Sequence, residues 1–176
     1  ESVLITGAPG TGKSHLTRTI IQLLRDKGER VTVLAKTHLA AHNVGGLTIN
    51  HFANKTIRRG KHPTGWVVVD EISMVDVACW AQLSKLAFCG LKWILVGDFN
   101  QYQPINDRWC GKPLAKKSFE HSSLLHTMVG GNRCRLAHNH RSDQRLFKLC
   151  GSLCPGRSRS HLPIRKMVAA AWEEFP

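Results

Sequence analysis

The sequence is poor in acidic residues and in long apolar runs. It has 12 Asp and Glu against 25 Lys and Arg in 176 residues, a formal net charge of +13. Such a charge favours polyanionic partners, most often nucleic acid, although solubility alone or a basic tail on a neutral domain is the alternative. No apolar run approaches the roughly 20 residues of a membrane span, and no signal peptide opens the chain. We expect no membrane partner, and an intracellular setting for which the nucleus and a viral replication site are both open.

The six cysteines lack the spacing of a disulfide framework, and a chain of this length does not need one. Cys150 and Cys154 lie four residues apart, with His161 beyond them, but zinc needs more ligands at closer spacing. We expect reduced thiols and no zinc site.

Short apolar runs alternate with segments of helical periodicity. Because continuous apolar strands separated by helices are typical of a parallel sheet covered on both faces, the pattern predicts an α/β fold. The expected strands are Val3–Thr6, Val31–Ala35, Trp66–Val69, Trp93–Val96 and Arg133–Ala137, and the expected helices are Lys13–Lys27, Val75–Phe88 and Phe119–Val129. In such sheets ligands bind beyond the carboxyl ends of the strands.

The stretch GAPGTGKS, residues 7–14, follows a predicted strand and opens a predicted helix. This context is typical of a Walker A loop, whose glycines let backbone N–H groups surround phosphate. Lys13 would reach the β- and γ-phosphates of ATP, and the Ser14 hydroxyl would bind Mg²⁺. The expected nucleotide-binding residues are Gly7, Ala8, Pro9, Gly10, Thr11, Gly12, Lys13, Ser14 and His15.

Two further strand ends carry polar residues. After WVVV, the Asp70 carboxylate would hold the Mg²⁺ ion together with Ser14, and Glu71 would act as the general base for the attacking water. A helix N-cap is the alternative interpretation of this acidic pair. After the next strand, in GDFNQYQPI, Gln101 would contact the γ-phosphate.

Two further stretches belong to the same series: KTHLAAHNVGGLTINHF and LAHNHRSD. In this order along the chain, the whole series resembles superfamily 1 helicases, most closely the RecD-like and PIF families. The resemblance covers most of residues 3–143. It implies a P-loop NTPase with a RecA-like sheet, in which ATP hydrolysis drives movement along a nucleic-acid strand. Catalytic roles are implied for Lys13, Glu71, Gln101 and Arg141; Arg141 resembles the arginine that contacts the γ-phosphate.

The resemblance also implies strand contacts. Thr37 and His38 would bind backbone phosphates, with Lys36 adding charge, and His51 and Phe52 would stack on bases. For Phe52 a core position is the alternative. Arg58 and Arg59 belong to the basic run NKTIRRGKH, which is either a phosphate contact or a solvated loop.

We expect residues 1–143 to form the first RecA-like domain, truncated at its N-terminus, and residues 144–176 a basic, partly helical tail. The motifs of a second RecA-like domain are not visible, so we expect that domain to be a missing partner. Single-stranded DNA and 5′-to-3′ movement are favoured by resemblance alone. The alternatives are a viral-type superfamily 1 RNA helicase domain and a non-catalytic nucleic-acid-binding fragment.

Overall fold

A computed structural model describes residues 1–61, 63–101, 104, 107–109, 112–113 and 120–141. The expected tail at 144–176 lies outside the described residues. So do Cys150, Cys154 and His161, the three positions considered for zinc.

The strands form a six-stranded sheet in the order β3-β2-β4-β5-β1-β8, and every neighbouring pair is parallel. The strands are β1 (Val3–Gly7), β2 (Val31–Ala35), β3 (Leu47–Thr48), β4 (Trp66–Asp70), β5 (Lys92–Gly97) and β8 (Arg133–Leu136). A separate antiparallel pair joins β6 (Arg108–Trp109) to β7 (Lys112–Pro113). The α/β fold predicted from the sequence is confirmed.

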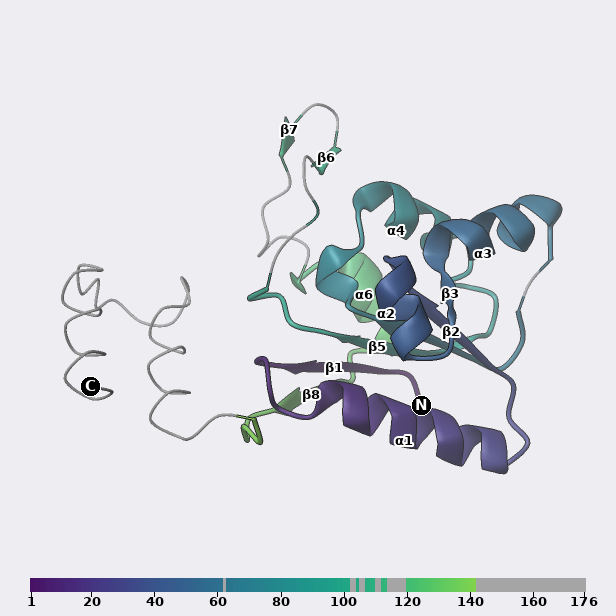
Figure 1. The fold of residues 1–176 in the computed structure, drawn as a ribbon. Coiled ribbons are helices and arrows are strands. Elements are labelled where there is room, and N and C mark those ends of the chain that lie inside the picture. Colours follow the sequence, from purple (N-terminus) through teal and green to yellow (C-terminus); the bar gives the residue numbers. More distant parts are fainter. Residues whose placement is uncertain (62, 102–103, 105–106, 110–111, 114–119, 142–176) are drawn as a thin grey trace.

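The sheet has helices on both faces (Figure 1). They are α1 (Lys13–Asp26), α2 (His38–Asn43), α3 (Ile49–Lys55), α4 (Val77–Ser84) and α6 (Ser123–Val129), with short 3₁₀ turns at η1 (Ile57–Arg59) and η2 (Ile72–Met74). Helix α1 covers one face, and α3, α4 and α6 lie over the other.

Helix α4 is shorter than predicted, and α6 covers residues 123–129 of the predicted 119–129, of which residue 119 lies outside the described residues. Helix α4 begins after Asp76, whose carboxylate accepts a hydrogen bond from the Cys79 N–H at 2.8 Å, and it ends at Ser84 rather than at Phe88. Helix α6 begins after Ser122, whose hydroxyl accepts from the Leu125 N–H. Both starts are N-caps, in which a side-chain oxygen satisfies an otherwise unpaired amide.

The core lies on both sides of β4. Val67 and Val69 face the cluster that includes α3, α4 and α6, whereas Val68 faces the cluster against α1. All three are fully buried. This alternation explains why the strand is apolar throughout, since a strand covered on both faces has no solvent side. Burial of each such side chain contributes roughly 1.5–3 kcal/mol.

Within the described ranges, none of the helices combines the length and apolarity needed to cross a membrane. Cys79, Cys89 and Cys134 are free thiols in this part of the chain.

Candidate nucleotide-binding and catalytic site

The loop between β1 and α1 has the backbone geometry of a phosphate-binding loop. Gly10 and Gly12 have φ values of 82° and 83°, a left-handed conformation that glycine adopts without steric cost. Gly7 allows a close approach, because a Cβ there would lie 2.5 Å from the Thr11 hydroxyl oxygen. That hydroxyl donates to the Ala8 carbonyl at 2.8 Å and closes the loop on itself.

Lys13, the first residue of α1, folds back over this loop. Its ammonium group donates to the carbonyl oxygens of Gly7 at 2.8 Å and Ala8 at 3.0 Å. Burial lowers the pKa of Lys13, and the negative charges of Asp98, Asp70 and Glu71 partly oppose this effect. The two hydrogen bonds therefore hold the ammonium at the loop, where it also senses the charges of these carboxylates.

The acidic pair lies at the end of β4, as predicted. Asp70 is 8% exposed, and one of its carboxylate oxygens accepts a hydrogen bond from the Glu71 N–H at 2.9 Å. Burial raises the pKa of Asp70, and burial together with the charge of Asp70 raises the pKa of Glu71. A raised pKa brings a carboxylate closer to the value that suits a general base.

Glu71 also has a strained backbone. Its φ is 54°, and among the described residues it is the one non-glycine residue with a positive φ. Such strain costs of order 1–3 kcal/mol and is concentrated at functional sites. The alternative interpretation of the acidic pair, a helix N-cap, does not describe Glu71, since its side chain makes no capping hydrogen bond to η2.

The segment after β8 crosses the phosphate loop. Because β8 pairs with β1, this segment reaches the same edge of the sheet. The His140 N–H donates to the Gly10 carbonyl at 2.9 Å, and the Asn139 side-chain amide donates to the Pro9 carbonyl at 3.3 Å. Arg141 follows directly, and its positive charge is one of the influences that lower the pKa of Lys13.

Asn139 and His140 were not predicted as site residues. Their pairing with a loop about 130 positions away has no local signal in the sequence.

Gln101 lies at the same edge, in the turn after β5. Its N–H donates to the Asp98 carbonyl at 3.0 Å, and its side chain is half-buried. The strand ends at β1, β4, β5 and β8 thus bring Lys13, Asp70, Glu71, Gln101 and Arg141 to one edge of one sheet.

Ser14 and Asp70 offer a hydroxyl and a carboxylate oxygen, the donor types that Mg²⁺ prefers. Among the described residues there is no cluster of three or more His, Cys, Asp or Glu side chains that could enclose a metal ion. This donor set fits Mg²⁺, which usually keeps water ligands and binds through one or two protein groups plus substrate phosphates.

The predicted strand contacts divide into exposed and buried residues. Thr37, His38 and His51 are exposed, and the Thr37 hydroxyl also caps α2 by accepting from the Ala40 N–H at 3.1 Å. Arg58 and Arg59 are exposed in η1, where Arg58 donates to the Asn54 side chain at 3.2 Å.

Phe52 requires a correction. It is 3% exposed and belongs to the core cluster beneath α3, so it is not available to stack on a base. Ile49, Phe52 and Ala53 form the buried side of α3, which is why the aromatic ring faces inward.

Lys36 is also engaged within the protein. Its ammonium forms an ion pair with the Asp76 carboxylate and donates to the Cys79 sulfur at 3.2 Å. This contact connects the end of β2 with the start of α4. The Lys36 ammonium is therefore not free to bind a backbone phosphate of the strand.

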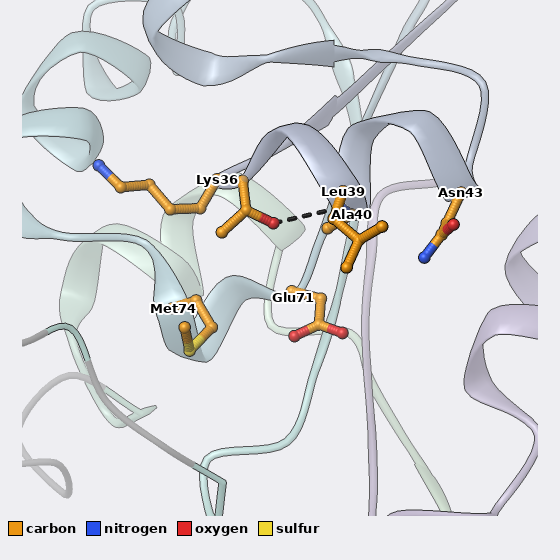
Figure 2. Close-up of a pocket in the computed structure, with 7 residues that line it drawn as sticks. Lys36, Leu39, Ala40, Asn43, Glu71 and Met74 are labelled. Carbon is orange, nitrogen blue, oxygen red and sulfur yellow. Dashed lines mark hydrogen bonds between the residues drawn. The ribbon is translucent and has the colours of Figure 1, made fainter.

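A pocket of about 210 Å³ lies between α2 and the turn after β4 (Figure 2). Leu39, Ala40 and Asn43 line it from α2, and Glu71 and Met74 line it from the opposite side. The pocket therefore adjoins both the segment expected to bind the strand and the expected catalytic base.

The parallel sheet, the glycine-dependent loop with Lys13 folded over it, and the acidic end of β4 define a P-loop NTPase with a RecA-like fold. A family model described as AAA domain matches residues 1–129. The chain belongs to this family.

Known proteins that are similar in sequence to this chain are named as DNA helicases. "ATP-dependent DNA helicase PIF1" of Candida albicans is 39% identical over 132 residues, which are 59% of this chain and 15% of that protein. The Emericella nidulans protein of the same name is 36% identical over 165 residues, or 73% of this chain and 22% of that protein. The human protein of this name is 33% identical over 133 residues, which are 60% of this chain and 20% of that protein. The chain thus spans about a fifth of the length of these relatives.

Solved structures of Pif1 helicases have a similar fold. The crystal structure of Pif1 helicase from Candida albicans matches with a TM-score of 0.69 and 28% identity, covering 90% of this chain and 42% of that one. Bacteroides Pif1 bound to ssDNA matches with a TM-score of 0.66 over 98% of this chain and 46% of that one; at 16% identity it supports the fold alone. The predicted resemblance to the first RecA-like domain of a superfamily 1, PIF-like helicase is confirmed.

Proposed function

We propose that this chain is the ATP-binding and ATP-hydrolysing domain of a DNA helicase that moves along single-stranded DNA, with 5′-to-3′ polarity. The observation that carries the proposal is the convergence of Lys13, Asp70, Glu71, Gln101 and Arg141 on one edge of the sheet. The relatives named ATP-dependent DNA helicases, at 33–39% identity, support DNA as the strand and an intracellular setting.

The residues have distinct roles in the proposed reaction. The loop N–H groups and Lys13 bind the phosphates, and Glu71 accepts a proton from the attacking water. Arg141 and Gln101 would lie near the transferred phosphate, where the positive charge of Arg141 would stabilise the transition state. Mg²⁺, held by Ser14 and Asp70, would neutralise charge on the phosphate oxygens.

We propose that residues 1–143 act with a second RecA-like domain supplied by a longer protein. In superfamily 1 helicases ATP lies between two such domains, so the chain supplies one wall of the site. Thr37, His38 and His51 are proposed to contact the strand, with Arg58 and Arg59 adding contacts to phosphates.

The test is ATP turnover by the protein in which this domain occurs, measured with and without a single strand. We expect oligothymidine to stimulate turnover more than oligouridine does. Stronger stimulation by RNA would favour the viral-type RNA helicase instead. Strand binding with no ATP binding would favour the non-catalytic fragment.

A further inference from the structure

Asp98 is a buried carboxylate for which the proposed reaction has so far no role. It follows β5 directly and is 4% exposed. One oxygen accepts a hydrogen bond from the Asn100 N–H at 2.9 Å, whereas the other, Oδ2, is buried and receives no hydrogen bond from any described residue. A buried charged oxygen without a partner is costly and rare, so its retention calls for an explanation.

The sheet places Asp98 beside the phosphate loop. Strands β1 and β5 are neighbours, with Thr6 paired to Gly97, so the next residues along these strands are Gly7 and Asp98. The Gly7 carbonyl is one of the two oxygens that hold the Lys13 ammonium. Among the carboxylates near Lys13, Asp98 raises its pKa the most, ahead of Asp70 and Glu71.

Lys13 has one donor beyond the two used in the structure. An ammonium group carries three N–H donors, and two of them go to Gly7 and Ala8. A lysine side chain is long and flexible, so its usefulness to a phosphate depends on what holds its end in place.

We propose that Asp98 is a positioning residue for Lys13, whose ammonium it attracts through its unpartnered oxygen and holds at the phosphate side of the loop. The inference rests on the proposed nucleotide site but not on helicase activity. Asp98 acts through Lys13 and does not touch ATP. Without Lys13, its negative charge would only repel the phosphates.

The experiment is a double-mutant cycle on Mg-ATP affinity, measured by calorimetry on the 176-residue chain. The variants are Asp98→Asn, Lys13→Ala and both together. Asparagine keeps an oxygen for the Asn100 N–H, so the turn is retained. Asp107→Asn is the matched control, because it also removes one negative charge, but at the start of α4, where Asp107 accepts from the Val77 N–H at 3.2 Å.

We expect Asp98→Asn to weaken ATP binding on the order of tenfold, as for removal of a charged partner. In the Lys13→Ala background the same substitution should leave affinity unchanged or improve it. Asp107→Asn should bind ATP like the wild type. The melting temperature of Asp98→Asn should equal or exceed that of the wild type, because the substitution removes an unpaired buried charge.

Three results would overturn the proposal for Asp98 alone: an equal decrease of affinity in both backgrounds, tighter binding by the single variant, or unchanged binding. Should Asp98→Asn not fold, Asp98→Ser, which also keeps an oxygen for the turn, replaces it in the cycle; failure of both to fold would make Asp98 structural and end the proposal. A wild-type chain that binds no ATP would overturn the nucleotide site itself and this inference with it.

Discussion

Glu71 combines two features that are unfavourable to stability and useful to catalysis. Its φ of 54° is strained, and its pKa is raised by burial and by the neighbouring Asp70. A stable fold gains nothing from either feature, so both support a catalytic role for this residue.

We therefore expect Glu71→Gln to separate binding from hydrolysis. The amide keeps the shape of the side chain but cannot accept the proton, so turnover should fall by about 10²-fold or more. ATP affinity should stay close to that of the wild type. Single-turnover hydrolysis and calorimetry measure the two quantities, and hydrolysis at the wild-type rate would remove Glu71 from the mechanism.

Lys36 and Asp76 give a prediction for stability at different pH values. Burial acts against both charges and is the largest single influence on each. The hydrogen bonds that the two groups make with each other and with Cys79, together with the attraction between their charges, outweigh it: the pKa of Asp76 is lowered and that of Lys36 is raised. A lowered acid pKa contributes stability that is lost as the pH falls, and a raised lysine pKa contributes stability that is lost as the pH rises.

Asp76→Asn should therefore lower the free energy of unfolding by about 1–2 kcal/mol near neutral pH. Asparagine still caps α4, so the difference reports the ion pair. Denaturant unfolding should show the two proteins converging as the pH falls below about 4 and as it rises above about 10.5. Asp26→Asn, on exposed α1, is the control and should change little; a difference for Asp76→Asn that is the same at every pH would contradict the ion-pair explanation.

At the scale of single elements, two adjacent residues of α3 have different roles: one packs in the core, and the other is proposed to bind the strand. Phe52 is in the core and His51 is exposed. Phe52→Ala should lower the free energy of unfolding by about 3–5 kcal/mol, as for other aromatic side chains removed from a core. His51→Ala should change it by less than about 0.5 kcal/mol and weaken strand binding instead. Thermal melts and strand titrations distinguish the two, and the reverse pattern would show that α3 faces the other way.

The strands and the main helix were predictable because their patterns are local. Continuous apolar runs mark the buried strands, and Gly12 and Gly28 bound α1. The segment from α2 to α3 was not predicted as helices, because each helix is shorter than two full turns. Thr37 and Thr48 cap these helices and were the available signal. The inward position of Phe52 could have been predicted from its spacing of three from Ile49.

The candidate site was predictable in part, for the same reason. Lys13, Asp70 and Glu71 stand at strand ends within recognisable motifs. By contrast, the crossing of the loop by Asn139 and His140, and the pairing of Lys36 with Asp76, join residues that are far apart along the chain. No local pattern encodes such contacts. Asp98 also follows a strand end, but only its burial in the structure shows that one oxygen lacks a partner.

For the whole molecule, the net charge of +13 predicts salt-dependent binding to single strands. Removing one side chain that binds a phosphate should reduce the slope of log affinity against log salt by about 0.7. Arg58→Ala with Arg59→Ala should therefore flatten the slope. Arg25→Ala with Lys27→Ala makes the same change in charge at the end of α1, on the opposite face of the sheet (Figure 1), and should leave the slope unchanged. Fluorescence anisotropy with labelled oligothymidine measures both, and equal slopes for the two double variants would exclude a specific role for η1.

The central claim is that the loop between β1 and α1 binds the phosphates of ATP through Lys13. The most direct measurement is calorimetric titration of Mg-ATP into the 176-residue chain and into Lys13→Ala, with thermal melts to show that both are folded. We expect the wild type to bind and the affinity of the variant to fall by at least about 10²-fold, because a half-buried charged partner of the phosphates is removed. Equal affinity in a folded Lys13→Ala protein would contradict the assignment of the site.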